Sequence, residues 1–185
     1  WVKSYNLKHK IALIKQYKKE NIHLLDIGAG TGDFVLSSKK YAHWEAMGIE
    51  PSEKARAKAE EKGLLLQADF SELLPHSFDV ITMWHVLEHV PDVTQEIQII
   101  SKLLKKDGIA VIAVPNYRSW DAQHYKEHWA AYDVPRHLWH FSKKSIEQLF
   151  AKEGFELLAI HPMLFDAFYV SMLSEQYKTS KKSFL

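Results

Sequence analysis

Cysteine is absent from the 185-residue sequence. This absence excludes disulfides, thiol nucleophiles and cysteine-based zinc sites. The sequence also lacks an excess of either charge, since 24 Lys and Arg against 23 Asp and Glu give a formal net charge of +1. A dedicated nucleic-acid-binding protein would carry a basic excess. No apolar run reaches the about 20 residues that span a bilayer, and the basic N-terminal stretch lacks a signal-peptide core. We therefore expect a cytoplasmic protein without a membrane span or a nucleic-acid partner.

Glycine is scarce as well, yet three of the seven glycines fall at Gly28, Gly30 and Gly32. The apolar run before them, residues 22–27, predicts a buried parallel strand, and Asp33 can cap a helix behind them. A strand, a glycine turn and a helix start bring bare backbone N–H groups close to a ligand at the carboxyl end of the strand. This stretch therefore predicts a cofactor loop.

The pattern of this loop distinguishes between cofactors. A dinucleotide fingerprint requires Gly or Ala five residues after the first glycine, where Asp33 stands, and no phosphate-binding Gly-Lys-Ser/Thr follows. What remains is an acid, Asp26, followed by G-x-G-x-G over 28–32. This pattern resembles the first motif of class I S-adenosylmethionine-dependent methyltransferases. S-adenosylmethionine carries an ammonium and a sulfonium, for which a nearby carboxylate is useful.

Strands and helices alternate along the chain. This alternation predicts an α/β fold with a doubly wound, mostly parallel, Rossmann-like sheet. We expect one domain over 1–185, made of an N-terminal helix (1–20), a cofactor-binding core (21–116), an aromatic insertion (117–141) and a C-terminal part (142–185). The predicted strands are 22–27, 44–50, 64–69, 78–84, 109–114 and 154–160, and the predicted helices are 3–20, 33–42, 51–62, 93–105, 145–153 and 165–173.

The family that the chain resembles usually adds an antiparallel seventh strand, which the sequence does not show clearly. We expect either that the chain ends before this strand or that residues 163–170 supply it. The sheet would lack its last strand in the first case.

Acidic residues end the second and third predicted strands. Glu50, 22 positions after Gly28, stands where an acid accepts the ribose hydroxyls of an adenosine. The resemblance implies that Asp69 contacts the adenine amino group, with Phe70 beside the ring. Either acid alone is as readily a solvated loop carboxylate, but acids at successive strand ends favour a site. The expected cofactor residues are Asp26, Gly28, Ala29, Gly30, Thr31, Gly32, Glu50, Pro51, Asp69, Phe70 and Trp84.

The resemblance extends over roughly residues 20–160. The stretch 77–92, SFDVITMWHVLEHVPD, is similar to small-molecule methyltransferases of the ubiquinone-biosynthesis type. The resemblance implies in-line transfer of a methyl group from S-adenosyl-L-methionine to a small-molecule acceptor, with S-adenosyl-L-homocysteine as product. Two alternatives stay open: an NAD-dependent oxidoreductase on the same sheet, and a non-catalytic scaffold domain that binds the cofactor. The acceptor and the oligomeric state are left open.

A general base is useful if the acceptor is a phenol or a hydroxyl group. His85 is the first candidate because it follows the strand 78–84 and should face the methyl group. His137 and Tyr132 come next, from the aromatic and histidine-rich segment 117–141. This segment is predicted to form a substrate lid or acceptor pocket, or else a hydrophobic cluster that closes the sheet edge.

One short motif points to a different chemistry. Residues 85–89 read H-x-x-E-H, the inverted zinc-peptidase signature, in which both histidines share one face of a helix. Pro91 arrives two residues after His89, and the run follows directly on a strand, so a continuous helix is not expected. We therefore predict no metal site and expect His89 to bond to the backbone. The spacing of the four histidines within 117–141 resembles no known ligand set.

Overall fold

The computed structural model describes residues 2–19 and 22–180. Its contacts divide the chain into two compact units. The first unit contains the residues up to Val86 together with Gln98–Ala113, and the second contains Leu87–Ile97 and the residues from Val114 on. Each unit has its own hydrophobic core. The expectation of a single domain stays a prediction.

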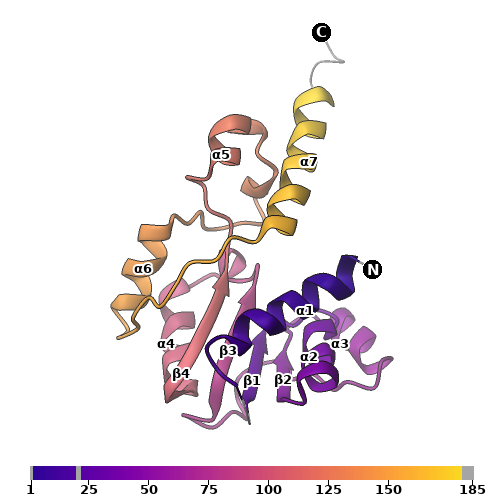
Figure 1. Ribbon diagram of the computed structural model, residues 1–185, viewed down its shortest axis with the longest axis vertical. Helices are drawn as coiled ribbons and strands as arrows, with labels where there is room; N and C mark the ends of the chain where they lie inside the picture. The colour runs from indigo at the N-terminus through magenta and orange to yellow at the C-terminus, as the bar shows by residue number, and fades with distance from the viewer. Residues whose placement is uncertain (1, 20–21, 181–185) are drawn as a thin grey trace. The chain divides into compact units, whose positions relative to one another are not determined.

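The first unit is built on a parallel four-stranded sheet (Figure 1). Its strand order is β2-β1-β3-β4, and every neighbouring pair is parallel. Four of the predicted strands are thereby confirmed: β1 (His23–Ile27), β2 (Glu45–Ile49), β3 (Phe78–Trp84) and β4 (Leu104–Ala113). The helices that accompany them are α1 (Val2–Lys15), α2 (Asp33–Ser37) with the π-helical turn η1 (Ser38–Ala42), α3 (Glu53–Glu60) and α4 (Val93–Leu103), whose second half belongs to this unit.

The central strands are buried because their sequences are apolar on both faces. Leu24 and Leu25 of β1 and Val80 and Ile81 of β3 are fully buried, as expected for strands covered on both sides. The helices α1, α2 and α3 contribute to one core cluster with Leu24 and Val80. The N-terminal helix predicted over 3–20 packs on this core through Ile11 and Ile14, and it ends at Lys15.

The predicted third strand over 64–69 is wrong. Only Gln67 forms a parallel bridge, with Ile49 of β2, and Leu65 is 80% exposed. The segment lies at an edge of the sheet, where one neighbour alone can pair with it. Asp69 then turns the chain away, because its Oδ1 atom accepts a hydrogen bond from the backbone N–H of Ser71 at 2.8 Å. Local turn chemistry thus limits the ladder to a single bridge.

Residues 106–108, between the predicted helix 93–105 and the predicted strand 109–114, lie within an irregular part of β4. Phe78 pairs with Leu104 and Val80 pairs with Ile109, so residues 105–108 lie opposite Asp79 alone. Lys105 Nζ donates to Asp79 Oδ2 at 2.8 Å and fixes this bulge. The last predicted strand of the core therefore begins at 104 rather than 109.

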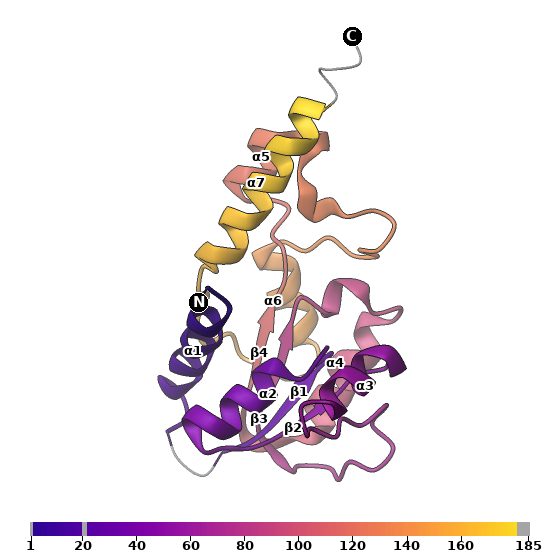
Figure 2. The same cartoon turned by 90° about the vertical axis from the view of Figure 1, so that its right-hand side faces the viewer.

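The second unit is helical and has its own core. It comprises η2 (Leu87–His89), the first half of α4, α5 (Trp120–Tyr125), η3 (Lys126–His128), η4 (Ala130–Tyr132), α6 (Lys143–Ala151) and α7 (Leu164–Ser180). The aromatic insertion packs around buried Trp129 and contacts Val170 of α7, and Figure 2 shows α5 and α7 side by side. The buried hydroxyl of Ser174 accepts a hydrogen bond from Ala130 N–H at 2.8 Å. Within residues 2–19 and 22–180, none of the helices combines the length and the apolar character that crossing a bilayer requires.

The predicted strand over 154–160 is also wrong. Residues 155–160 form no strand, and Leu157, Leu158 and Ile160 are exposed. Residues 164–180 form the helix α7, so 163–170 does not supply a further strand, whereas the helix predicted over 165–173 is confirmed. A strand requires a ladder partner, and the part of the chain that the structure describes provides none for 155–160.

Shortening a buried side chain of a central strand should destabilise the protein far more than shortening an exposed side chain of the segment 64–69. We expect Leu25→Ala to lower the free energy of unfolding by about 2–5 kcal/mol, because Leu25 is fully buried in β1. Leu65→Ala should change it by less than about 0.5 kcal/mol, because that side chain is 80% exposed. Urea unfolding of both variants measures the difference. A large loss of stability in Leu65→Ala would support the buried strand over 64–69 that the sequence predicts.

Candidate functional site

The glycine loop connects β1 to α2, and all three of its glycines have positive φ angles between 56° and 73°. A Cβ atom at Gly28 would lie 2.4 Å from Cγ2 of Val86, so glycine is required there for packing. A Cβ atom at Gly30 would meet no atom within 4 Å. Gly28 therefore makes room for the protein itself, whereas the backbone at Gly30 faces open space, as a ligand-binding loop requires.

Glu50 joins the end of β2 to this loop. Its Oε2 atom accepts a hydrogen bond from Gly30 N–H at 2.8 Å, and its Oε1 atom accepts one from Ser52 N–H at 2.9 Å. Arg56 donates to the carbonyls of Glu50 and Pro51, which fixes the turn from β2 to α3. The structure thus brings together two parts of the predicted site that are 20 residues apart in the sequence.

Asp26 is a buried carboxyl group near the carboxyl end of β1. The residue is 2% exposed, and its Oδ1 atom accepts a hydrogen bond from Thr82 Oγ1 at 2.7 Å. Burial raises the pKa of Asp26 to about 7, while the Thr82 hydrogen bond and the charge of Lys10 partly oppose this rise. A cation bound nearby would favour the ionised carboxylate.

The end of β3 supplies Trp84 and His85. The Trp84 ring packs edge-on against Phe34, and the Lys10 ammonium lies 4.3 Å from its centroid. Among the described residues, the buried indole Nε1 of Trp84 has no hydrogen-bond partner. His85 has a φ angle of 59°, a conformation uncommon outside glycine and frequent at functional sites. Trp84 ends β3 and His85 follows it, and β3 is parallel to β1, so both residues lie at the same end of the sheet as the glycine loop.

The remaining predicted cofactor residues have more local contacts. Thr31 Oγ1 donates to Asp33 Oδ2 at 2.7 Å and accepts from Lys62 Nζ at 3.0 Å, so this hydroxyl holds the loop against α2 and α3. Asp69 is exposed, and its hydrogen bonds from Ser71 lower its pKa. Phe70 is half-buried beside it. Their contacts to the adenine therefore stay a prediction.

The other two catalytic candidates belong to the second unit. His137 Nδ1 donates to the Ala131 carbonyl at 2.9 Å, and its Nε2 atom lies 3.8 Å from Asp133 Oδ2. Burial lowers the pKa of His137, which favours the neutral imidazole. Tyr132 packs edge-on against Trp129 and His140. His85, in contrast, belongs to the first unit. The general-base roles of all three residues stay predictions.

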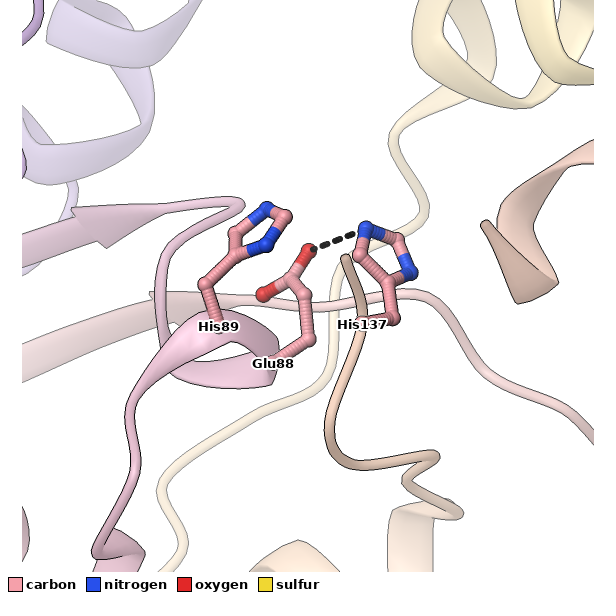
Figure 3. A group of neighbouring side chains, drawn as sticks. All are labelled: Glu88, His89 and His137. Carbon is pink, nitrogen blue, oxygen red and sulfur yellow. Dashed lines mark ion pairs between the residues drawn. The ribbon is translucent and has the colours of Figure 1, made fainter. Parts of the chain in front are cut away.

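Glu88 belongs to the H-x-x-E-H stretch, for which the sequence predicted no metal site. This glutamate is 1% exposed, and its Oε1 atom lies 4.0 Å from His137 Nε2 (Figure 3). His89 Nδ1 donates to the Arg136 carbonyl at 2.9 Å, so the prediction that His89 bonds to the backbone is confirmed. His85 and His89 do not share a helix, because η2 contains only residues 87–89.

A family model for a methyltransferase domain matches residues 3–160. Among curated proteins, the chain is similar to ubiquinone biosynthesis O-methyltransferases. It is 30% identical over 104 residues to that of Neisseria meningitidis, covering 50% of this chain and 44% of the relative. It is 39% identical over 107 residues to that of Pelagibacter ubique, covering 52% of this chain and 43% of the relative. The matched part of the chain spans less than half the length of these relatives.

Solved structures show the same fold. A possible histamine N-methyltransferase from Thermotoga maritima matches with a TM-score of 0.63 at 24% identity, over 84% of this chain and 76% of that chain. Phosphoethanolamine N-methyltransferase 2 of Haemonchus contortus, in complex with S-adenosyl-L-methionine, matches with a TM-score of 0.67 at 20% identity, over 96% of this chain and 44% of that chain. The prediction of a Rossmann-like methyltransferase fold is confirmed.

The buried carboxyl group of Asp26 should make stability depend on pH. Its pKa in the folded protein, about 7, lies above the ordinary value of 3.8. Between these values the folded protein retains a proton that the unfolded chain has lost, so raising the pH lowers stability, and the loss is complete above pH 7. Asp26→Asn removes this dependence and can keep the hydrogen bond from Thr82.

We therefore expect the stability advantage of Asp26→Asn over the wild type to grow by at most about 1.4 kcal/mol per pH unit between about pH 4 and 7, and then to level off. Urea unfolding of both proteins at several pH values measures this difference. Because the two proteins share all other titratable groups, subtracting one stability from the other cancels the contribution of those groups. A difference that does not change with pH would contradict the raised pKa.

Proposed function

The chain belongs to the family of methyltransferase domains, and from this premise we propose that it transfers a methyl group from S-adenosyl-L-methionine to a small-molecule acceptor. The observation that carries the proposal is the glycine loop: a side chain at Gly30 would enter open space, Glu50 accepts the Gly30 N–H, and buried Asp26 lies near the end of the strand that leads into the loop. The balanced net charge of +1 supports a small molecule rather than a nucleic acid as the acceptor.

The residues present fit this cofactor group by group. Asp26 offers a carboxylate to the ammonium. Glu50 accepts two backbone hydrogen bonds, and a carboxylate has about four lone-pair sites, so it can also accept the two ribose hydroxyls. Asp69 and Phe70, beyond the end of the segment that bridges to β2, would hold the adenine. The buried Trp84 indole N–H can donate to an acceptor on the same ligand.

An NAD-dependent oxidoreductase is the alternative that shares this sheet. Asp33 stands where a dinucleotide fingerprint has its third small residue. Its carboxylate lies in the first turn of α2 and is held by Thr31 and Lys62. A large side chain ion-paired with Lys62 stands where the dinucleotide fingerprint requires a small residue for close helix packing, so the loop does not match that fingerprint. The comparisons give no support to the oxidoreductase.

The chemistry assigns limited tasks to the protein. When bound, the sulfonium supplies a methyl group that is already electrophilic, so the chain mainly positions the partners and excludes water. The names of the curated relatives support an oxygen atom as acceptor. A hydroxyl or phenol acceptor must lose its proton, and we propose His85 as the base, with His137 and Tyr132 as the next candidates. The conformation of His85 at the end of β3 supports the first assignment.

The role of Glu50 can be tested on binding alone. Glu50→Gln should weaken S-adenosylhomocysteine binding by about tenfold to a hundredfold, since hydrogen bonds to charged groups contribute about 1.5–3 kcal/mol. Glu53→Gln is the matched control, because Glu53 is exposed in the first turn of α3 and should change affinity less than about twofold. Isothermal titration calorimetry measures both dissociation constants. Equal affinities in the two variants would remove Glu50 from the proposed site.

The catalytic assignment needs a separate readout. His85→Ala should keep the affinity for S-adenosylhomocysteine and lower kcat by about 10²–10⁴ with a phenolic acceptor, the usual contribution of a general base. His124→Ala, an exposed position in α5, should leave both unchanged. Methyl transfer from labelled S-adenosylmethionine to a panel of phenols and quinols measures kcat. Full turnover by His85→Ala would transfer the role to His137 or Tyr132, and wild-type binding without any turnover would favour a scaffold.

A further inference from the structure

We propose that Glu88, His89 and His137 form a binding site for one divalent transition-metal ion of the Zn²⁺ type in the second unit (Figure 3). This site is independent of the proposed methyl transfer and of the glycine loop. The three side chains come from η2 and from the segment before α6, which are far apart in the sequence. Figure 3 shows them turned toward one another.

The spacing of the ligand atoms carries the first step. One donor atom from each residue lies within 4.8 Å of the others, and His137 Nε2 is 4.0 Å from Glu88 Oε1. This distance is too long for a direct hydrogen bond. Zinc bonds to nitrogen and carboxylate oxygen measure about 2.0–2.2 Å, so two ligands of one tetrahedral ion lie about 3.4 Å apart. Binding would draw the three atoms together by up to about 1.4 Å.

The second step is the orientation of both imidazoles. His89 Nδ1 contacts the Arg136 carbonyl and His137 Nδ1 contacts the Ala131 carbonyl, each at 2.9 Å. A carbonyl oxygen can only accept, so each Nδ1 atom must carry the proton. In a neutral ring the lone pair then lies on Nε2, which in His137 is the atom that lies 4.0 Å from Glu88 Oε1. Metal-binding histidines are usually held in this way by a backbone carbonyl or a carboxylate.

The backbone holds the two ligand-bearing segments together. The carbonyl of Glu88 accepts hydrogen bonds from Leu138 N–H at 2.8 Å and from Trp139 N–H at 3.3 Å. The Trp139 indole donates to the Val90 carbonyl at 2.8 Å. These bonds join residues 88 and 90 to residues 138 and 139, which are the ligand residues or their neighbours in the sequence. The two ligand-bearing segments are therefore held together before an ion binds. Such preorganisation lowers the cost of binding.

The charges favour a cation, and the ligand types select its class. The Glu88 carboxylate is buried, so a divalent ion would offset its negative charge, whereas the nearby Asp133 carboxylate is already paired with Arg136 at 2.6 Å. Two imidazoles and one carboxylate suit Zn²⁺ or Co²⁺ better than Mg²⁺ or Ca²⁺, which prefer oxygen ligands. His89 is exposed, which gives access from solvent. Three protein ligands leave a fourth position for water or an anionic ligand.

The competing explanation is a purely structural network in which His137 and Glu88 form an ion pair. Cobalt distinguishes the two, because four-coordinate Co²⁺ has a strong visible spectrum that an ion pair cannot produce. The experiment is a Co²⁺ titration of the untagged, metal-free full chain, followed by Zn²⁺ displacement. We expect one ion per chain and loss of the spectrum when Zn²⁺ is added.

Variants locate the ion. His89→Gln and His137→Gln should each weaken Co²⁺ binding by at least about tenfold, whereas His124→Gln should not, because that exposed ring stacks on Trp120 and is not one of the three ligands. Circular dichroism of the metal-free variants checks the fold. Because His89 is exposed, His89→Gln should stay folded, and it tests the site even if His137→Gln unfolds. The absence of a cobalt spectrum in the wild type, or an unchanged spectrum in His89→Gln, would overturn the proposal. Neither result bears on binding at the glycine loop.

Discussion

The hydrogen bond from the Gly30 N–H to the Glu50 carboxylate is the interaction on which the first unit's site depends. It joins the loop after β1 to the end of β2, so two neighbouring strands present their functional groups at the same end of the sheet. Parallel pairing of β1 with β3 then brings Thr82 opposite Asp26. The buried carboxyl group, the open glycine backbone and the second carboxylate therefore follow from one sheet register.

The sequence predicted the elements whose signals are local. Apolar runs located β1 and β3, because strands buried on both faces require apolar residues. The glycine spacing located the loop, because positive φ angles favour glycine. The segments 64–69 and 154–160 have equally apolar sequences but form no strands. Strand formation depends on a partner elsewhere in the chain, and a run of leucines does not show whether that partner exists.

The same distinction separates the two candidate sites. Asp26 and Glu50 end consecutive strands, so the sequence pattern alone brought them together. Glu88 and His137 meet only because the segment before α6 returns to η2, and no spacing rule links them. The aromatic insertion was predicted as either a lid or a hydrophobic cluster, and its packing around Trp129 with α7 gives it a core of its own.

Thermal unfolding with excess S-adenosylhomocysteine, and separately with excess NAD, tests the central claim most directly. A ligand at 100 times its dissociation constant stabilises the folded protein by about 2.7 kcal/mol. For a chain of this size that corresponds to a rise of about 5–10 °C in the midpoint. The account predicts this rise with S-adenosylhomocysteine and none with NAD. A rise with NAD alone would contradict it.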